Sequence, residues 1–454
     1  MKATTDKRRN WRAPLLCMLV CCGLSVLWGV SVAQSPNGFA DMKAAYYATG
    51  CLIGGHNPYK VGELDSYEAG RGQQVKGTAM FRQDLTVYMN LPATFVLLAP
   101  LAMLPFGVAN AIWLSVAAVV LMAAAWLMWH QGARHAPSAS LALICVILAN
   151  NEIVFEVGNT AALIVGLCAL AAWCFVEKRF ELAGVFCLGV SLAVKPHDAG
   201  FIWLYFLLAG GIYRRRAMQS LLVAAVPVVA GFLWVGHVAP HWMRDWQANM
   251  AAISGAGGLN QPGPYSVTGV KGGMVIDLQS AITVFSSNPK IYNLVSYAIC
   301  GAFLVVWTVR TVKLRSSRAH AWLGLAAVMA PTILITYHRS QDAKLLLLAI
   351  PACAMLWSKR GVIGWLAMVL TSLSIVFTAD IPLTIWVMLR PYMPVGMSGT
   401  LGRILAVIFL VPTPLILLAM GILYLWAYVK SDAVLCAPAK VEKPKGSLLV
   451  PEPA

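Results

Sequence analysis

A polar stretch near the N-terminus combines a carboxylate, aromatic residues and a turn. Asp41 precedes Tyr46, and residues 54–59 read Gly-Gly-His-Asn-Pro-Tyr, ending in Tyr59. The stretch follows a long apolar run, so we expect Asp41 just beyond a membrane exit. A carboxylate in that position can take a proton from a substrate hydroxyl as a general base. In the alternative, Asp41 only caps an amphipathic helix at the interface.

A basic cluster ends another apolar run. The sequence there is Ala193-Val194-Lys195-Pro196-His197-Asp198, and the proline predicts that the helix stops at Lys195. A lysine at such a helix end is a suitable phosphate ligand, because it is a point charge on a flexible stem. The alternative is a lysine that only extends toward the lipid head groups.

Two further segments offer polar side chains at the ends of apolar runs. His338 and Arg339 follow one run, and Asn159 follows Gly158 after another. Arg339 can bind a phosphate through two parallel hydrogen bonds, and His338 can donate to the phosphate or orient an acid. The Asn159 amide can bind a sugar hydroxyl. The alternative for His338 and Arg339 is an ordinary loop pair that faces the lipid head groups. The alternative for Gly158 and Asn159 is a simple turn.

The remaining acids and the cysteines do not form a pattern typical of a metal or disulfide site. Glu63, Asp65, Glu68 and Asp84 share the loop that contains Asp41, and we expect them to be solvated charges. The outer loops contain no Asp-x-Asp cluster, so no metal and no cofactor is predicted. Nine of the eleven cysteines fall within apolar runs and only Cys51 lies in an external polar segment, which excludes a disulfide framework.

The composition is that of a polytopic membrane protein. Of the 454 residues 59% are hydrophobic and 11% are charged, with a mean hydropathy of +0.72. Soluble domains have about 25% charged residues. The net charge of +16 comes from short basic clusters between apolar runs. Such clusters indicate cytoplasmic loops rather than a nucleic-acid surface.

The apolar runs predict an all-α bundle of about twelve transmembrane helices. The expected spans cover residues 13–33, 106–129, 139–155, 160–176, 182–195, 200–213, 217–236, 291–309, 320–336, 343–357, 361–378 and 402–428. The first run ends in Ser31-Val32-Ala33, so a cleaved signal peptide is an alternative for it. Residues 1–430 form one membrane domain in this interpretation, and 431–454 form a disordered cytoplasmic tail.

The positive-inside rule orients these spans. Placing every basic connection inside gives a consistent alternation only if residues 88–104 do not cross, so we expect a helix there in the outer interface. Asp41, Asn159, Lys195 and His338 then share the outer face. A carboxylate opposite two basic clusters suits a phosphate-activated donor and a hydroxyl acceptor, because the cations stabilise the leaving phosphate.

The order and spacing of several segments resemble glycosyltransferase family 87, whose members have the GT-C fold. The resembling pieces are Asp41 with Ala44-Ala45-Tyr46-Tyr47, residues 55–59, 91–92, 98–105, 111–113, 158–160, 183–184, 195–196, 337–339 and 345–351. The resemblance implies a polyprenyl-phosphate sugar donor, inversion at the anomeric carbon, and Asp41 as the base. It also implies juxtamembrane helices in the first external loop.

We therefore expect a hexosyltransferase, with mannose as the expected sugar, in a bacterial-type inner membrane. Lys195, His338 and Arg339 would bind the donor phosphate, while Tyr46, Tyr59, Asn159 and His197 would contact substrate. The acceptor would be a lipid or a glycan. The competing interpretations are a transporter or lipid flippase, which would favour charges in mid-span and paired halves, and a non-catalytic envelope scaffold.

Overall fold

The computed structural model describes residues 11–34, 38–71, 87–264, 266, 275–314, 317–389, 392 and 399–432, and these residues form helices and no strands. The first helices are α1 (Arg12–Val32), α2 (Ala40–Ile53), α3 (Val61–Gly70), α5 (Ala93–Ala102), α6 (Phe106–Gly132), α7 (Pro137–Ala149), α8 (Glu152–Val157), α9 (Ala161–Glu177), α10 (Glu181–Val194) and α11 (Pro196–Leu208). They are followed by α12 (Gly211–Val238), α13 (Trp242–Ser254), α15 (Leu278–Ile282), α16 (Pro289–Lys313), α17 (Arg318–Leu334), the 3-10 helix η1 (Asp342–Ala349), α18 (Ile350–Ser358), α19 (Val362–Phe377), α20 (Asp380–Leu389), α21 (Gly399–Leu410) and α22 (Pro412–Val429). The expected all-α class is confirmed.

Six helical stretches in the described part of the chain are long and apolar enough to cross a membrane. They are α1, α6, α7 with α8, α12, α16 and α22, and the bent pair α19–α20 would make a seventh. The expected count of about twelve is not confirmed. Helices α9, α10 and α11 have 17, 14 and 13 residues, which is short of the roughly 20 that a span needs.

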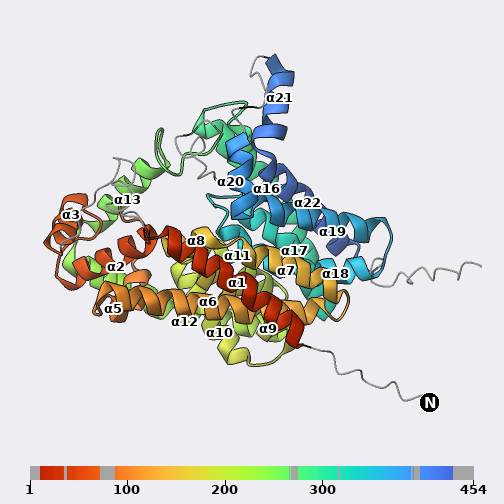
Figure 1. The fold of residues 1–454 in the computed structure, drawn as a ribbon, viewed down its shortest axis with the longest axis horizontal. Coiled ribbons are helices and arrows are strands. Elements are labelled where there is room, and N and C mark those ends of the chain that lie inside the picture. The colour runs from red at the N-terminus through yellow and green to blue at the C-terminus, as the bar shows by residue number, and fades with distance from the viewer. Residues whose placement is uncertain are drawn as a thin grey trace, which may run out of the picture.

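The last predicted span is wrong. Residues 402–428 were expected to form one helix, but α21 ends at Leu410 and α22 begins at Pro412. Pro412 and Pro414 lack the backbone N–H that a continuous helix would use at these positions. As a result α21 extends away from the bundle in Figure 1. The predicted tail lies, from residue 433 on, outside the described residues.

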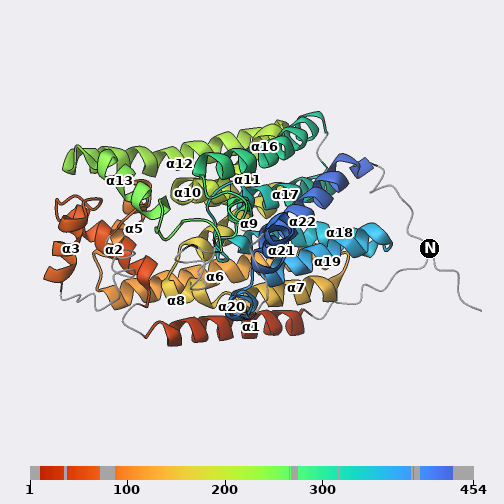
Figure 2. The same cartoon turned by 90° about the horizontal axis from the view of Figure 1, so that it is seen from above.

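The connections between helices lie at two opposite ends of the molecule. Helices α2, α3, α5 and α13 lie at one end, and the start of α1 and the α18–α19 turn lie at the other (Figures 1 and 2). At the second end, Glu177 pairs with Arg134 at 3.4 Å and with Arg318 at 2.9 Å. Connections that the positive-inside rule assigned to one face are therefore in contact with one another.

The first external loop packs as a compact layer. Helix α5 packs against α2 and α12, and its 10 residues are too few to cross a bilayer, in keeping with the expectation for residues 88–104. The prediction that Glu68 is a solvated charge is wrong. Its side chain in α3 is buried, and burial raises its pKa to about 8. Glu63 accepts from the Asn57 amide, and Asp84 lies outside the described residues.

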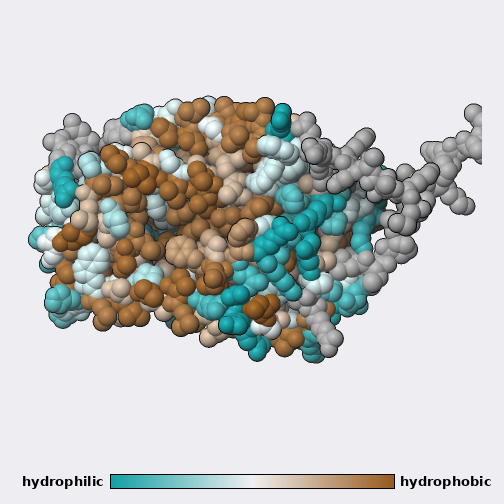
Figure 3. Space-filling view, turned by 90° about the horizontal axis from the view of Figure 1, so that it is seen from below, coloured by the Kyte–Doolittle hydropathy of each residue, from teal (hydrophilic) through white to brown (hydrophobic). Residues whose placement is uncertain are grey.

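The centre of the molecule is made of elements that are buried on nearly all sides. Every residue of η1 is buried, as is α17 from Ala321 to Leu334 and most of α9. Small residues allow the close packing, since a Cβ on Gly166 of α9 would meet Val120 of α6 at 2.7 Å. Around this core, apolar side chains cover a broad part of the outer surface (Figure 3). The ends of the rigid central elements carry the polar residues described next.

Candidate active site

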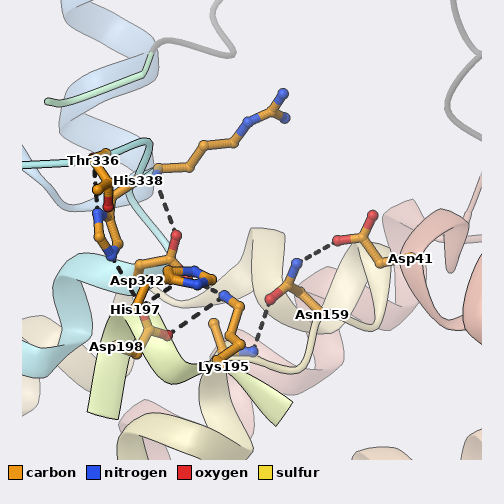
Figure 4. A network of polar contacts seen from close by, with 10 residues as sticks. Asp41, Asn159, Lys195, His197, Asp198, Thr336, His338 and Asp342 are labelled. Atoms are coloured by element: carbon orange, nitrogen blue, oxygen red, sulfur yellow. Dashed lines mark hydrogen bonds and ion pairs between the residues drawn. The ribbon is translucent and has the colours of Figure 1, made fainter. Parts of the chain in front are cut away.

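Asp41 is held by a turn that connects α8 to α9. Gly158 ends α8 with φ +68°, a left-handed conformation that favours glycine, and Trp113 donates to its carbonyl at 3.0 Å. The next residue, Asn159, accepts from the Ala161 amide at 2.7 Å and donates from Nδ2 to the Asp41 carboxylate (Figure 4). The turn therefore fixes the side-chain amide of Asn159, and this amide orients the Asp41 carboxylate through its hydrogen bond.

Asp41 does not act as a helix cap. It lies in the first turn of α2, whose N-cap is Phe39, and no side chain caps this helix end. The residue is open to solvent, yet the surrounding protein displaces enough water to raise its pKa, against the opposing effects of Asn159, Arg339 and Lys195. These observations together describe an exposed carboxylate that lies near enough to Arg339 and Lys195 for both cations to act on it.

Lys195 lies at a break between two helices. Helix α10 ends at Val194 and α11 begins at Pro196, so the helix stops at Lys195, as predicted, and this residue has the non-helical angles φ −134° and ψ 75°. Its ammonium group pairs with Asp342 and lies 3.5 Å from Asp198 Oδ2, and its side chain keeps 14% exposure. Lysine carries three N–H donors, so the two carboxylates fix its direction and leave it a donor for a further group.

Asp342 joins two parts of the site. One of its carboxylate oxygens pairs with Lys195, and the other accepts from the Arg339 backbone amide at 3.1 Å. Asp342 starts η1 and is itself only 2% exposed. The Arg339 guanidinium donates from Nη2 to the Leu259 carbonyl at 3.2 Å and to Asn260 at 3.3 Å. The loop after α13 is thereby attached to the site.

His338 is fully buried, and both of its ring nitrogens face acceptors. Nε2 lies 3.0 Å from Asp198 Oδ1, and Nδ1 lies 3.0 Å from the Thr336 carbonyl (Figure 4). A carboxylate and a carbonyl both require a proton on the nitrogen that faces them, so the geometry favours the imidazolium. Although burial lowers the pKa of His338, the hydrogen bond and the charge of Asp198 raise it overall above the ordinary value of 6.5.

His197, Asp198 and His338 are the described residues that can together hold a metal ion. One ligand atom from each lies within 4.8 Å of the others. His197 Nε2 is 3.7 Å from Asp198 Oδ1, and the two histidine rings are 5.2 Å apart. In this arrangement, however, the Asp198 carboxylate already faces Lys195 and His338, whose positive charges occupy the place of a metal ion.

The two tyrosines expected to bind substrate lie elsewhere. Tyr46 is buried against Phe106 and donates to the Leu104 carbonyl at 2.6 Å. Tyr59 is 1% exposed and donates to the Asn90 carbonyl at 2.7 Å. Both hydroxyls hold the external layer of α2 and α5 together, and the structure does not bring them into contact with the cluster.

The structure thus brings Asp41, Asn159, Lys195, His197 and His338 to one end of the central helices (Figure 4). Arg339 belongs to the same group, because its backbone amide donates to Asp342. The sequence interpretation missed the part played by Asp198 and Asp342 in anchoring the cations. A signal for Asp198 exists in the chain, because this carboxylate stands three residues after Lys195. Within a helical turn this spacing places the two side chains together.

A family model described as glycosyltransferase family 87 matches residues 88–336, which is more than half of the chain. The matched segment contains Asn159, Lys195 and His197. It begins after Asp41 and ends before His338, so the proposed role of Asp41 rests on the geometry above. Comparisons with curated proteins and with solved structures gave no match.

A first prediction concerns Gly158. In Gly158→Ala the added Cβ would lie 2.6 Å from Cβ of Met42, the neighbour of Asp41, and the residue would be strained at positive φ. We expect a loss of about 1–3 kcal/mol of stability, measured as a lower melting temperature in detergent. Gly236→Ala, where the Cβ meets open space, is the control. Equal melting temperatures for the two variants would contradict the tight turn.

A second prediction concerns pH. The raised pKa of His338 means that its stabilising contribution is complete below about 6.5 and is lost as the pH rises through the raised value. Melting temperatures measured across this range should fall with pH in the native protein, and this part of the fall should be absent in His338→Gln. His197→Gln changes the neighbouring, 39% exposed ring and serves as the control. Identical pH profiles for native protein and His338→Gln would refute the imidazolium.

Proposed function

The chain belongs to glycosyltransferase family 87, and we propose that it transfers a hexose from a polyprenyl-phosphate sugar to a lipid or glycan hydroxyl. The family and the apolar helices make the protein a membrane glycosyltransferase. The choice of mannose, the lipid-linked donor and a site on the outer face of a bacterial-type inner membrane belong to the proposal. A transporter or flippase has no comparable support from the comparisons.

The observation that carries this proposal is the opposition of one carboxylate to a group of cations. Asp41 is oriented by Asn159 and is close enough to Arg339 and Lys195 for both charges to lower its pKa. A sugar transferred from a phosphate needs both kinds of group, one at the attacking hydroxyl and one at the leaving phosphate. In this proposal the anomeric carbon would lie between Asp41 and the cations.

In the proposed reaction the acceptor oxygen attacks the anomeric carbon from the side opposite the phosphate. The new bond from carbon to acceptor oxygen forms as the bond from carbon to phosphate oxygen breaks, which inverts the configuration. Asp41 takes the acceptor proton, and the electron pair of the broken bond leaves on the polyprenyl phosphate. The displacement of water that raises the pKa of Asp41 favours proton transfer, because it makes the carboxylate a stronger base.

Lys195 and Arg339 would stabilise the leaving phosphate. The charges of Asp198 and Asp342 offset those of Lys195 and His338, so the group with Arg339 keeps one net positive charge. Arginine can bind a phosphate with two parallel hydrogen bonds, and lysine adds a point charge. The cluster is therefore attractive to a phosphate without leaving several like charges unbalanced in a buried site.

His338, Asp198 and Asp342 would be positioning residues. The His338 ring is fully buried and bonded at both nitrogens, so in this arrangement it acts on a phosphate through Asp198 and Lys195 rather than by contact. This refines the expectation that His338 binds the donor directly. Asn159 is a positioning residue for Asp41, while exposed His197 lies where a substrate group can reach it.

A third prediction tests the base. Asp41→Asn keeps the size of the side chain but cannot accept the hydroxyl proton, so turnover should fall by about 10²–10⁴-fold. Donor affinity should be kept or increase, because Asp41 repels an anionic phosphate. Both quantities are measured with purified variants and a series of polyprenyl-phosphate sugars. The control is Asp245→Asn, which alters a carboxylate that binds Asn57 in the external layer.

Near-native turnover in Asp41→Asn would exclude Asp41 as the base. Absence of transfer from every polyprenyl-phosphate sugar by the native protein, with transfer from a nucleotide sugar instead, would overturn the donor part of the proposal and leave the family assignment intact.

A further inference from the structure

A cavity of about 660 Å³ lies far from the candidate active site, at the other end of the α7–α8 stretch. It opens between the start of α7 and the turn that joins α18 to α19, elements that lie side by side in Figures 1 and 2. The residues of its lining that matter here are His135, Ser138, Trp357, Ser358, Arg360 and Trp365. This is the end of the molecule where the basic connections gather.

The cavity has the charge of an anion site. His135 and Arg360 line it, and none of its lining residues is a carboxylate. Helix α7 starts there with Pro137, and its N-cap residue provides no side-chain acceptor. The amides of Ser138 and Ala139 therefore have no acceptor within the helix, and the positive end of the helix dipole adds to the field. Arg134 and Lys359 contribute to this field, since both help to lower the pKa of His135.

Aromatic and apolar residues beside the cavity match the edge of a bilayer. Trp357 and Trp365 meet edge to face, with ring centroids 4.7 Å apart, and tryptophan is typical of the membrane interface. From this point an exposed apolar stripe runs along α19, made of Val362, Leu366, Val369 and Leu373. Their spacing of three and four residues places them on one helix face.

We propose that this cavity binds the head group of an anionic phospholipid of the cytoplasmic leaflet, with an acyl chain lying along the α19 stripe. Arg360, His135 and the α7 amides would contact the phosphate. Basic pockets between helices on the cytoplasmic side are suited to such head groups. The apolar stripe favours a lipid over a free phosphate ion, because only a lipid would use both the cavity and the helix face that leads from it.

The test measures lipid binding to the full-length protein in detergent. The purified protein is stripped of lipid and titrated with phosphatidylglycerol, with phosphatidylcholine and with inorganic phosphate, and bound lipid is counted by native mass spectrometry. We expect phosphatidylglycerol to bind more tightly than phosphatidylcholine, and inorganic phosphate not to compete at equal concentration. The double variant His135→Gln/Arg360→Gln should weaken phosphatidylglycerol binding about tenfold or more, because it removes the charge-assisted contact of Arg360 and the hydrogen bond of the His135 ring.

The matched control is Arg318→Gln, which removes an exposed arginine that pairs with Glu177 at the same end of the molecule but does not line the cavity. Melting temperatures without lipid check that the variants fold, and since His135 and Arg360 are exposed we expect no change. Equal affinity for the two lipids, or equal losses in the double variant and the control, would overturn the proposal. Competition by inorganic phosphate at equal concentration would also overturn it and indicate a small-anion site.

Discussion

The ammonium group of Lys195 lies between the carboxylates of Asp342 and Asp198, at the junction of α10 and α11. With His338 these groups form a cluster of four, and three of its members, Asp198, His338 and Asp342, are almost fully buried. Loss of an ionic partner would therefore cost any of them a large free energy. Removing one member of a buried ion pair typically costs about 3–5 kcal/mol, because an uncompensated charge remains. This constraint fixes the ends of α10, α11, α17 and η1 relative to one another.

The rest of the site depends on that fixed arrangement. Arg339 is held because its backbone amide donates to Asp342, and the loop after α13 is held because Arg339 donates to it. On the other side, Asn159 stands at the start of α9, which packs against α10 and η1. The distance from Asp41 to the cations is therefore set by the packing of buried helices, which is the rigid support that a catalytic site requires.

The sequence predicted the positions that follow from local chemistry. Pro196 marks the helix break at Lys195, the glycine before Asn159 marks a tight turn, and the basic connections mark one face. These features depend on single residues and their neighbours in the chain. The co-facial arrangement of Asp41, Lys195 and His338 was also predicted, because the alternation of basic loops carries that information.

The sequence predictions that failed concern residues whose burial and contacts depend on packing between distant parts of the chain. Tyr46, Tyr59 and Glu68 are polar residues in a loop rich in turns, and nothing in the chain reveals that α2, α3 and α5 bury them. Helices α10 and α11 have the composition of spans but only 14 and 13 residues, so the expected count of about twelve crossings is not confirmed. The anchoring by Asp342 of Lys195, 147 residues earlier, is a long-range contact of the same kind.

The most direct measurement is a double-mutant cycle on the pair Lys195–Asp342, which orients the proposed phosphate-binding lysine. The kcat/KM for transfer is measured for the native protein, Lys195→Met, Asp342→Asn and the double variant, all checked for folding. If Asp342 acts by holding Lys195, the double variant will be about as impaired as Lys195→Met alone, with a coupling energy of at least about 0.5 kcal/mol. Effects of the two substitutions that simply add, or an Asp342→Asn variant as active as the native protein, would contradict the account.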